Sequence, residues 1–238
     1  MIDFVTAPAT LPPGHRAYAI GDVHGCLDRL ATLHERIAED LATRPVDDSI
    51  LIHLGDYVDR GLDSAQVIDW LSGGAPVPAG RIVNLMGNHE DMMLHALAGT
   101  DKEATSIWLA NGGADSLSSW EISRKVPAAD WTSLIPEEHQ RFLRELEISF
   151  RVGGYLFVHA GIRPEVPLDY QDKQDMLWIR EPFLSWKHSH AAVVVHGHTP
   201  RHDPEIRLNR IGIDTGAVMG GALTCAVLEG DRIGFMQS

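Results

Sequence analysis

Short, largely hydrophobic runs recur along the chain, and each ends abruptly in a cluster of Gly, Asp, Asn or His. These runs are AYAI before Gly21, ILIHL before Gly55, RIVNLM before Gly87, YLFV before His159 and AVVV before His196. An apolar run of about four to eight residues bounded by turn residues is typical of a strand buried on both faces. The pattern therefore predicts buried strands that carry polar residues at their carboxyl ends.

Hydrophobic residues at helical spacing lie between the first of these runs. One such series is Leu27, Leu30, Leu33, Ile37 and Leu41. A second helical pattern runs from Ser64 to Leu71. Residues three and four apart share one face of a helix, so both segments are expected to be amphipathic helices. Because predicted strands and helices alternate, we expect a layered α/β fold.

Residues 91–146 differ from the rest, because they show little strand pattern. Helix-like segments cover Met92–Ala98, Glu103–Ala110 and Pro136–Leu146, which predicts a helical insert. After it the chain becomes rich in strand patterns. Ile148–Val152 and Tyr155–His159 flank Gly153-Gly154 as a hairpin, and Ile206–Ile213, Ala222–Leu228 and Arg232–Met236 follow. We expect one domain over residues 1–238, with a mixed two-sheet core of the α/β (mixed α+β) class.

Composition narrows the function classes. The chain of 238 residues has 33 acidic and 20 basic residues, a formal net charge of −13, and no long basic run, so no nucleic-acid polymer is expected as a partner. The only cysteines, Cys26 and Cys225, are too few for a disulfide framework and indicate a reducing compartment. The N-terminus lacks the plan of a signal peptide, and no run approaches the roughly 18 apolar residues of a membrane span. We expect a cytoplasmic protein that does not bind membranes.

The polar clusters at the strand ends predict one shared metal site. In open α/β sheets, ligands bind at the carboxyl ends of strands. The clusters offer Asp22, His24, Asp56, Asn88, His159 and His198, a mixed oxygen and imidazole set without thiolate that suits Mn, Fe, Zn or Co. Two divalent ions beside two carboxylates would leave about two positive charges in the pocket, enough to attract a phosphate dianion. Glycines 21, 25, 55, 61, 87 and 197 flank these ligands and allow close backbone approach.

Any single histidine is more simply explained as a packing or surface residue. The combination of five clusters, each at a strand end, favours the metal site over that explanation. The remaining histidines lack such neighbours and are expected to be ordinary residues: His15, His34, His53, His95, His139, His188, His190 and His202.

These motifs resemble a known family. GDVHG, GDYVDRG and GNHE, followed by HAG and GHTP, are similar to the phosphoprotein phosphatases, the metal-dependent Ser/Thr phosphatases, and most similar to their bacterial and lambda phage branch. NHEDMML, WLANGG, LWIRE and IDTGAV extend the resemblance, which runs from about Ala17 to the C-terminus. It implies a β-sandwich flanked by helices and a centre of two divalent ions, with Mn²⁺ expected and Fe, Zn, Co or Ni as alternatives.

The resemblance also implies a role for each motif residue. Asp22 and His24 would bind the first metal, Asp56 would bridge both, and the second would be bound by Asn88, His159 and His198. The family motif places a ligand directly before Thr-Pro, so His198 is preferred, and His196 is given a supporting or structural role.

Catalytic roles follow from the same motifs. His89 resembles the family's general acid, Asp59 would orient it, and Arg60 and Arg180 would grip phosphate oxygens through their planar guanidinium groups. The simpler alternative for Asp59-Arg60 is an ion pair that caps a turn. One departure concerns Met86, because many relatives have a phosphate-binding arginine directly before GNHE.

The sequence predicts a metal-dependent phosphomonoester hydrolase, a Ser/Thr or dual-specificity protein phosphatase in which a hydroxide bridging the metals attacks phosphorus. Its substrate would be a phosphorylated protein or a small phosphoester. The alternative is a symmetrical bis(5'-nucleosyl)-tetraphosphatase, although such relatives tend to lack the aspartate of VDRG, which here is Asp59. A third alternative, an inactive metal-binding module, would predict loss of His89, Asp59 or a ligand, and all are present. The oligomeric state is not predicted.

Overall fold

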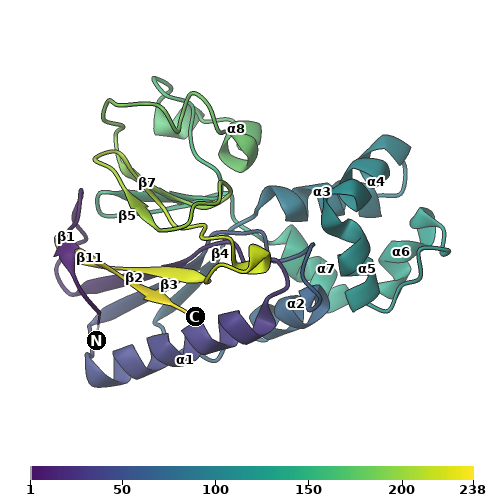
Figure 1. Cartoon of the computed structure of the whole chain (residues 1–238), viewed down its shortest axis with the longest axis horizontal. Coiled ribbons are helices and arrows are strands. Elements are labelled where there is room, and N and C mark those ends of the chain that lie inside the picture. Colours follow the sequence, from purple (N-terminus) through teal and green to yellow (C-terminus); the bar gives the residue numbers. More distant parts are fainter. Residues whose placement is uncertain (1) are drawn as a thin grey trace.

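Two β-sheets packed face to face form the centre of the fold, in a computed structural model that describes residues 2–238 (Figure 1). The first sheet has the order β1 (Val5–Thr6), β11 (Arg232–Gln237), β10 (Thr224–Glu229), β2 (His15–Ile20), β3 (Asp48–His53) and β4 (Arg81–Asn84). The second has the order β5 (Ser149–Val152), β6 (Tyr155–Val158), β7 (Val193–His196), β9 (Arg210–Gly212) and β8 (Glu205–Ile206). Strands β2, β3 and β4 are parallel, as are β6, β7 and β9.

The alternation of side chains along each strand builds three apolar layers. Ala17 and Ile50 of the first sheet meet Phe157 and Val195 of the second in the central layer. The opposite face of the first sheet packs against the helices, and that of the second packs against the segment after β6. Successive side chains of a strand point to opposite faces, so a strand buried on both faces reads as a continuous apolar run. This accounts for the unbroken hydrophobic runs in the sequence.

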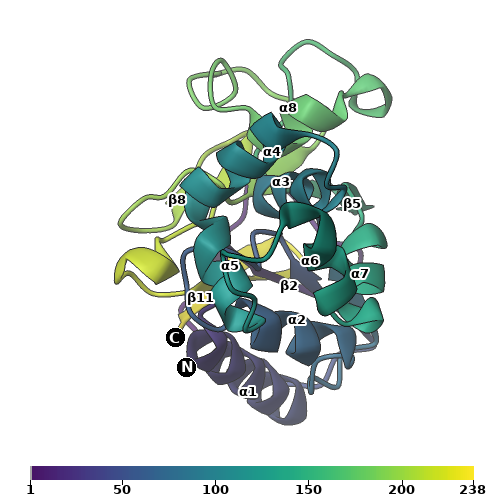
Figure 2. The same cartoon turned by 90° about the vertical axis from the view of Figure 1, so that its right-hand side faces the viewer.

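The helices cover the first sheet and one end of both sheets. Helix α1 (Leu27–Thr43) lies beneath the first sheet, followed by α2 (Ser64–Ser72) (Figure 1). The insert contains α3 (Asn88–Leu97), α4 (Lys102–Trp108), a π-helical turn (Leu109–Gly113), α5 (Ala114–Ser119), α6 (Ala128–Leu134) and α7 (Glu137–Arg144). Figure 2 shows these insert helices grouped in front of the strand ends. Helix α8 (Lys173–Trp178) and the 3-10 turns Leu168–Tyr170 and Ala217–Met219 complete the described helices.

The predicted fold class is confirmed, with local differences. All five apolar runs form strands, and α1 and α2 begin at the predicted residues. The predicted strand region Ile206–Ile213 is divided into β8 and β9, which pair as an antiparallel hairpin. Helices α5, α6 and α8 and the short β1 were not predicted. No helix within residues 2–238 is long and apolar enough to cross a membrane.

Candidate metal centre and active site

The loops that follow the parallel strands bring the predicted site residues to one edge of the two sheets. Asp22 and His24 follow β2, Asp56 follows β3, and Asn88 and His89 open helix α3 just after β4. His159 follows β6 and His198 follows β7 in the second sheet. All seven side chains are buried. Parallel neighbouring strands end at the same edge, so one site receives residues from segments far apart in the sequence.

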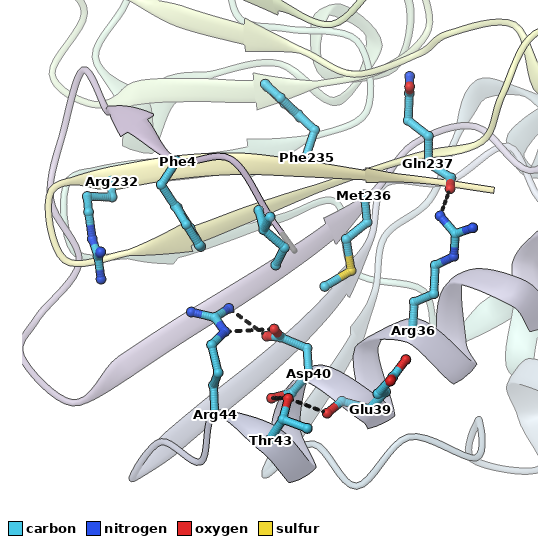
Figure 3. A pocket seen from close by; sticks show the side chains of 11 residues that line it. Phe4, Arg36, Glu39, Asp40, Thr43, Arg44, Arg232, Phe235, Met236 and Gln237 are labelled. Carbon is cyan, nitrogen blue, oxygen red and sulfur yellow. Dashed lines mark hydrogen bonds and ion pairs between the residues drawn. The ribbon is translucent and has the colours of Figure 1, made fainter.

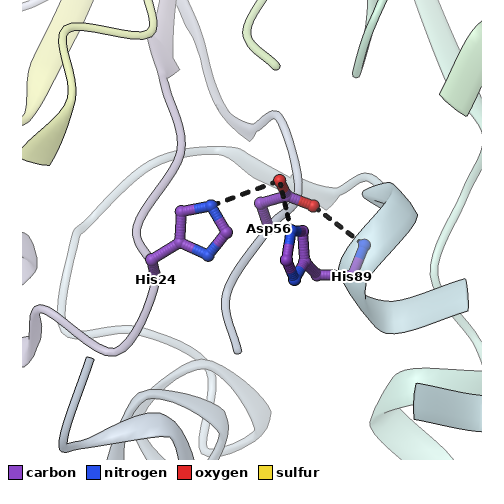
Figure 4. A group of neighbouring side chains, drawn as sticks. All are labelled: His24, Asp56 and His89. Atoms are coloured by element: carbon purple, nitrogen blue, oxygen red, sulfur yellow. Dashed lines mark hydrogen bonds and ion pairs between the residues drawn. The ribbon is translucent and has the colours of Figure 1, made fainter. Parts of the chain in front are cut away.

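The carboxylate of Asp56 lies at the middle of this site. Its Oδ2 is 3.4 Å from Nε2 of His24 and 4.0 Å from Nε2 of His89, and its Oδ1 is 3.4 Å from Nε2 of His159. Figure 4 shows the His24 and His89 side chains on two sides of this carboxylate. Two groups of potential metal ligands therefore share Asp56: one with His24 and His89, the other with His159 and His198.

Hydrogen bonds fix which ring nitrogens present lone pairs to the site. Nδ1 of His24 donates to the Val58 carbonyl at 2.8 Å, and Nδ1 of His159 donates to the Leu54 carbonyl at 2.9 Å. A neutral imidazole carries one proton, so Nε2 of both rings is left as an acceptor. Nε2 of His159 nevertheless lies 2.9 Å from Oδ1 of Asn88, which is another acceptor. Two acceptors at this distance fit a shared cation.

His198 completes the second group. Its Nδ1 lies 2.9 Å from Oδ1 of Asn88, while its buried Nε2 has no hydrogen-bond partner. Burial, the neighbouring His159 and the Arg180 guanidinium lower the pKa of His198 to about 3. The ring is therefore neutral at physiological pH, the state in which an imidazole binds metal. Since Nδ1 is the ring nitrogen that lies beside the Asn88 oxygen, it is the atom through which His198 would contact an ion shared with Asn88.

Negative charge is concentrated in the same buried volume. Burial, followed by the carboxylates of Asp214 and Asp56, raises the pKa of Asp22 well above its usual range. Burial also raises the pKa of Asp214. Burial opposes ionisation of Asp56 as well, but the imidazoles of His159 and His89 hold its pKa well below the usual range. Crowded carboxylates beside imidazoles form a donor set that fits divalent ions.

His89 and Asp59 form a buried pair at this site. Nδ1 of His89 donates to Oδ2 of Asp59 at 2.6 Å, which leaves Nε2 directed toward Asp56. No ion pair joins Asp59 to Arg60 within residues 2–238, so the turn-capping alternative is not observed. Both residues have left-handed backbone, with φ of 72° and 70°. The Asp59 carboxylate is buried, whereas the Arg60 side chain is exposed.

The two predicted phosphate-binding arginines lie on the exposed side of the site. Nη1 of Arg60 is 3.0 Å from Nε2 of His24. Arg180 is exposed in the loop after α8 and close enough to His198 to affect its pKa. Met86, in contrast, is only 5% exposed and packs in the apolar layer beneath the first sheet. The residue before GNHE therefore contributes to the core and not to the surface of the site.

His196 belongs to neither group of potential ligands. Its Nδ1 donates to the Gly197 carbonyl at 3.0 Å, and its ring packs edge-on against Phe183 with 5.0 Å between centroids. Burial lowers its pKa to about 4. These contacts are those of a packing residue.

Glu90 was not predicted and ties two loops of the site together. Its buried carboxylate accepts backbone N–H groups from Asp56 at 2.8 Å, Tyr57 at 2.7 Å, Val58 at 3.2 Å and Gly87 at 2.9 Å. The last residue of the GNHE motif thus holds the loop after β3 against the start of α3. Asp214 was also missed as a site residue, although IDTGAV had marked its segment.

Two glycines permit very close contact between these loops. A Cβ atom on Gly87 would lie 2.2 Å from Oδ1 of Asp56, and one on Gly197 would lie 2.0 Å from Oδ1 of Asp22. Real Cβ atoms do not approach other atoms this closely. Glycine is therefore required at both positions for the carboxylates to stand where they do.

A separate pocket of about 770 Å³ lies between α1 and β11 (Figure 3). Its Arg44 pairs with Asp40 at 2.8 Å and with Glu229 at 3.1 Å, and its Arg36 donates to the Gln237 carbonyl. Since these cations already have partners, the pocket adds no reactive group to the site at the strand ends.

Comparison with known proteins places this geometry in a family. Residues 15–221 match the calcineurin-like phosphoesterases. The chain is 30% identical over 228 residues to serine/threonine-protein phosphatase 1 of Salmonella typhimurium, covering 89% of this chain and 91% of that protein. It is 26% identical over 223 residues to the asymmetrical bis(5'-nucleosyl)-tetraphosphatase PrpE of Anoxybacillus flavithermus, covering 86% and 87%.

A solved structure of a proposed diadenosine tetraphosphatase has the same fold, with a TM-score of 0.67 over 97% of this chain and 98% of that chain at 23% identity. A cold-active protein tyrosine phosphatase follows with a TM-score of 0.60 over 94% and 78% at 20% identity. The family resemblance and the hydrolase activity predicted from the motifs are confirmed by the match across residues 15–221 and by the 30% identity along most of both chains. This chain belongs to the calcineurin-like phosphoesterases, hydrolases that use a dinuclear centre of divalent metal ions.

Proposed function

We propose that this protein removes phosphate from phosphoserine and phosphothreonine in proteins, using two divalent ions, Mn²⁺ in the cell. The observation that carries the proposal is the buried His89–Asp59 pair, which faces the same Asp56 carboxylate as the candidate ligands. The alkoxide that leaves a serine or threonine phosphate is strongly basic and needs a proton as it departs. A proton donor at this place suits that leaving group.

Each ion has a candidate set of ligands. Asp22 and His24 would hold the first ion, and the second would be held by Asn88, His159 and His198. Asp56 would contact both, since its two carboxylate oxygens face different groups. When bound, the ions would supply a water that is acidic enough to react near neutral pH, and positive charge for the phosphoryl oxygens.

The protein's own side chains would then orient the ester and move one proton. Arg60 and Arg180 bind two phosphoryl oxygens from the exposed side of the site. As the oxygen of water bonds to phosphorus and the ester P–O bond breaks, Nε2 of His89 gives its proton to the leaving oxygen, and one proton of the water is released to solvent. Asp59 holds the ring in place through Nδ1. The products are inorganic phosphate and the free hydroxyl of the substrate.

Dinucleoside polyphosphate hydrolysis is the second candidate, because relatives carry that name. The curated relatives that carry this name, such as PrpE of Anoxybacillus flavithermus, are named as asymmetrical enzymes, whereas the alternative predicted from the motifs is a symmetrical one. Cleavage of a phosphoanhydride releases a nucleotide phosphate, a weakly basic leaving group that needs little help from an acid. The intact His89–Asp59 pair therefore favours the monoester substrate. We also propose a cytoplasmic location, consistent with the two free cysteines.

A comparison of three substrates tests the proposal: a phosphoserine peptide, p-nitrophenyl phosphate and diadenosine tetraphosphate, each with added Mn²⁺. We expect the phosphoserine peptide to be preferred over the dinucleotide. His89→Asn should lower kcat on the peptide by about a hundredfold or more, because a general acid contributes about that much, while bound metal stays near normal. His95→Asn is the matched control, since His95 lies exposed on the same helix.

Two results would contradict the proposal. A large excess of activity on diadenosine tetraphosphate would reassign the substrate class. Unchanged turnover of the phosphoserine peptide by His89→Asn would remove His89 as the acid.

A further inference from the structure

The carboxylate of Asp59 receives more hydrogen bonds than its contact with His89 requires. Nε1 of Trp108 lies 3.0 Å from its Oδ1 and 3.1 Å from its Oδ2, and the Ser116 hydroxyl donates to Oδ1 at 2.6 Å. Asp59, Trp108 and Ser116 are all fully buried. Both additional donors come from the helical insert, which lies about 50 residues further along the chain.

The insert also holds the backbone of the loop that carries Asp59. The Asp59 N–H group donates to the hydroxyl of Ser116 at 2.8 Å. The next residue, Arg60, donates its backbone N–H to the Gly112 carbonyl at 3.4 Å. One short stretch of the insert, from Trp108 to Ser116, therefore contacts both the partner of the acid and an arginine proposed to bind phosphate.

The local structure of this stretch depends on the sequence WLANGG. Trp108 ends α4, and the chain kinks at Gly112, whose φ of 113° lies outside the helical region, before α5 begins. A Cβ atom on Gly113 would lie 2.5 Å from the indole of Trp108, and one on Gly112 would lie 2.8 Å from the backbone nitrogen of Arg60. The two glycines let the indole and the Asp59 loop come into direct contact.

We propose that Trp108 and Ser116 are positioning residues for the general acid, so that the helical insert takes part in proton transfer without touching the substrate. Two donors on Oδ1 prevent rotation of the Asp59 carboxylate and keep Oδ2 directed at Nδ1 of His89. A His–Asp pair held in this way presents Nε2 at a fixed place, and small displacements of a catalytic group reduce its contribution strongly. The inference rests on the proposed function.

Trp108→Phe tests the inference, since it keeps an aromatic ring in the insert and removes the N–H donor. We expect kcat on a phosphoserine peptide to fall by about tenfold, the lower end of what loss of a supporting hydrogen bond costs. On p-nitrophenyl phosphate the loss should stay below about twofold, because p-nitrophenolate is weakly basic and leaves without a proton. KM and bound metal should be unchanged.

Trp131→Phe is the matched control. Trp131 lies in the same insert and packs edge-on against Trp108, but its Nε1 donates to the Val126 carbonyl. Its substitution should affect both substrates little and equally. Ser116→Ala should repeat the substrate-dependent loss, and Ser116→Thr, which keeps the hydroxyl, should restore most of the activity. If Trp108→Phe fails to fold, as judged by thermal unfolding, the comparison of Ser116→Ala with Ser116→Thr tests the inference in its place.

A double variant distinguishes an effect of Trp108 on the position of His89 from a general disturbance of the fold. If Trp108 acts through His89, then Trp108→Phe in a His89→Asn background should cause no further loss on the phosphoserine peptide. Equal losses on both substrates, loss of metal, or additive losses in the double variant would overturn the inference. The proposed function would survive that outcome, because it depends on the response of wild type and His89→Asn alone.

Discussion

Replacement of Glu90 by glutamine isolates the contribution of one buried carboxylate to the arrangement of the site. Oε1 accepts from Tyr57 and Val58, and Oε2 accepts from Asp56 and Gly87. Glutamine has nearly the same shape, but one of its two ends is an NH₂ group. That end would face two backbone N–H donors and leave both unpaired in a buried place.

The expected loss of stability follows from those two donors. An unsatisfied buried donor costs about 1–3 kcal/mol, so two cost about 2–6 kcal/mol. Part of this is offset, because burial and the Asp56 carboxylate raise the pKa of Glu90 to about 8, so the ionised form that accepts all four bonds is itself disfavoured and a neutral side chain costs less in its place. We expect the free energy of unfolding to fall by about 2–3 kcal/mol, which lowers the Tm of a protein of this size by about 4–12 °C.

Thermal unfolding with saturating Mn²⁺ measures the loss, and elemental analysis measures the accompanying decrease in bound metal. Glu147→Gln is the matched control, since Glu147 is about half exposed and contacts Arg81 only at 3.9 Å. Its Tm should change little, as for most surface pairs. A Glu90→Gln protein with a Tm within about 1 °C of wild type and full metal content would refute the reasoning.

Two further predictions concern metal binding and acid stability. Asp56→Asn should lose most of the bound metal, because one carboxylate faces both ligand groups, and full occupancy by elemental analysis would exclude a bridging role. The free energy of unfolding should fall as pH decreases from about 6.5 to about 4. Burial lowers the pKa of His34 to about 4 and that of His53 to about 3, so both stay neutral in the folded state and take up protons only on unfolding. A pH series of thermal unfolding checks this, and an equal slope in a His34→Leu/His53→Leu double variant would contradict it.

The fold was largely predictable because its signals are local. A buried strand such as Val193–His196 shows as an apolar run, and the long helix α1 shows several turns of hydrophobic spacing. Helices α5, α6 and α8 have six or seven residues, fewer than two full turns, so their spacing resembles that of a loop. The sequence predicts one strand region where the structure has the two strands β8 and β9. The two residues of β8 are too few to show a hydrophobic pattern of their own.

The site was predictable only where its residues follow strands directly. Asp56 and Asn88 stand next to a strand end and a glycine, and the structure brings them together as expected, although their roles as ligands stay predictions. Trp108 and Ser116 reach Asp59 from 49 and 57 positions away in the chain, and no spacing in the sequence encodes that contact. The packing of Met86 in the core, directly before GNHE, was likewise not predicted from the sequence.

The close approach at Gly87 and Gly197 restricts how this enzyme can diverge in evolution. Each loop rests on a carboxylate that belongs to another loop, with no room for one additional carbon atom between them. A substitution that thickens one loop displaces an acidic group on another, so these segments can change only in concert. The exposed outer face of the insert and the loop that carries Arg180 have no such restriction. Descendants with new substrates would therefore differ in those outer segments while the inner edge stays constant.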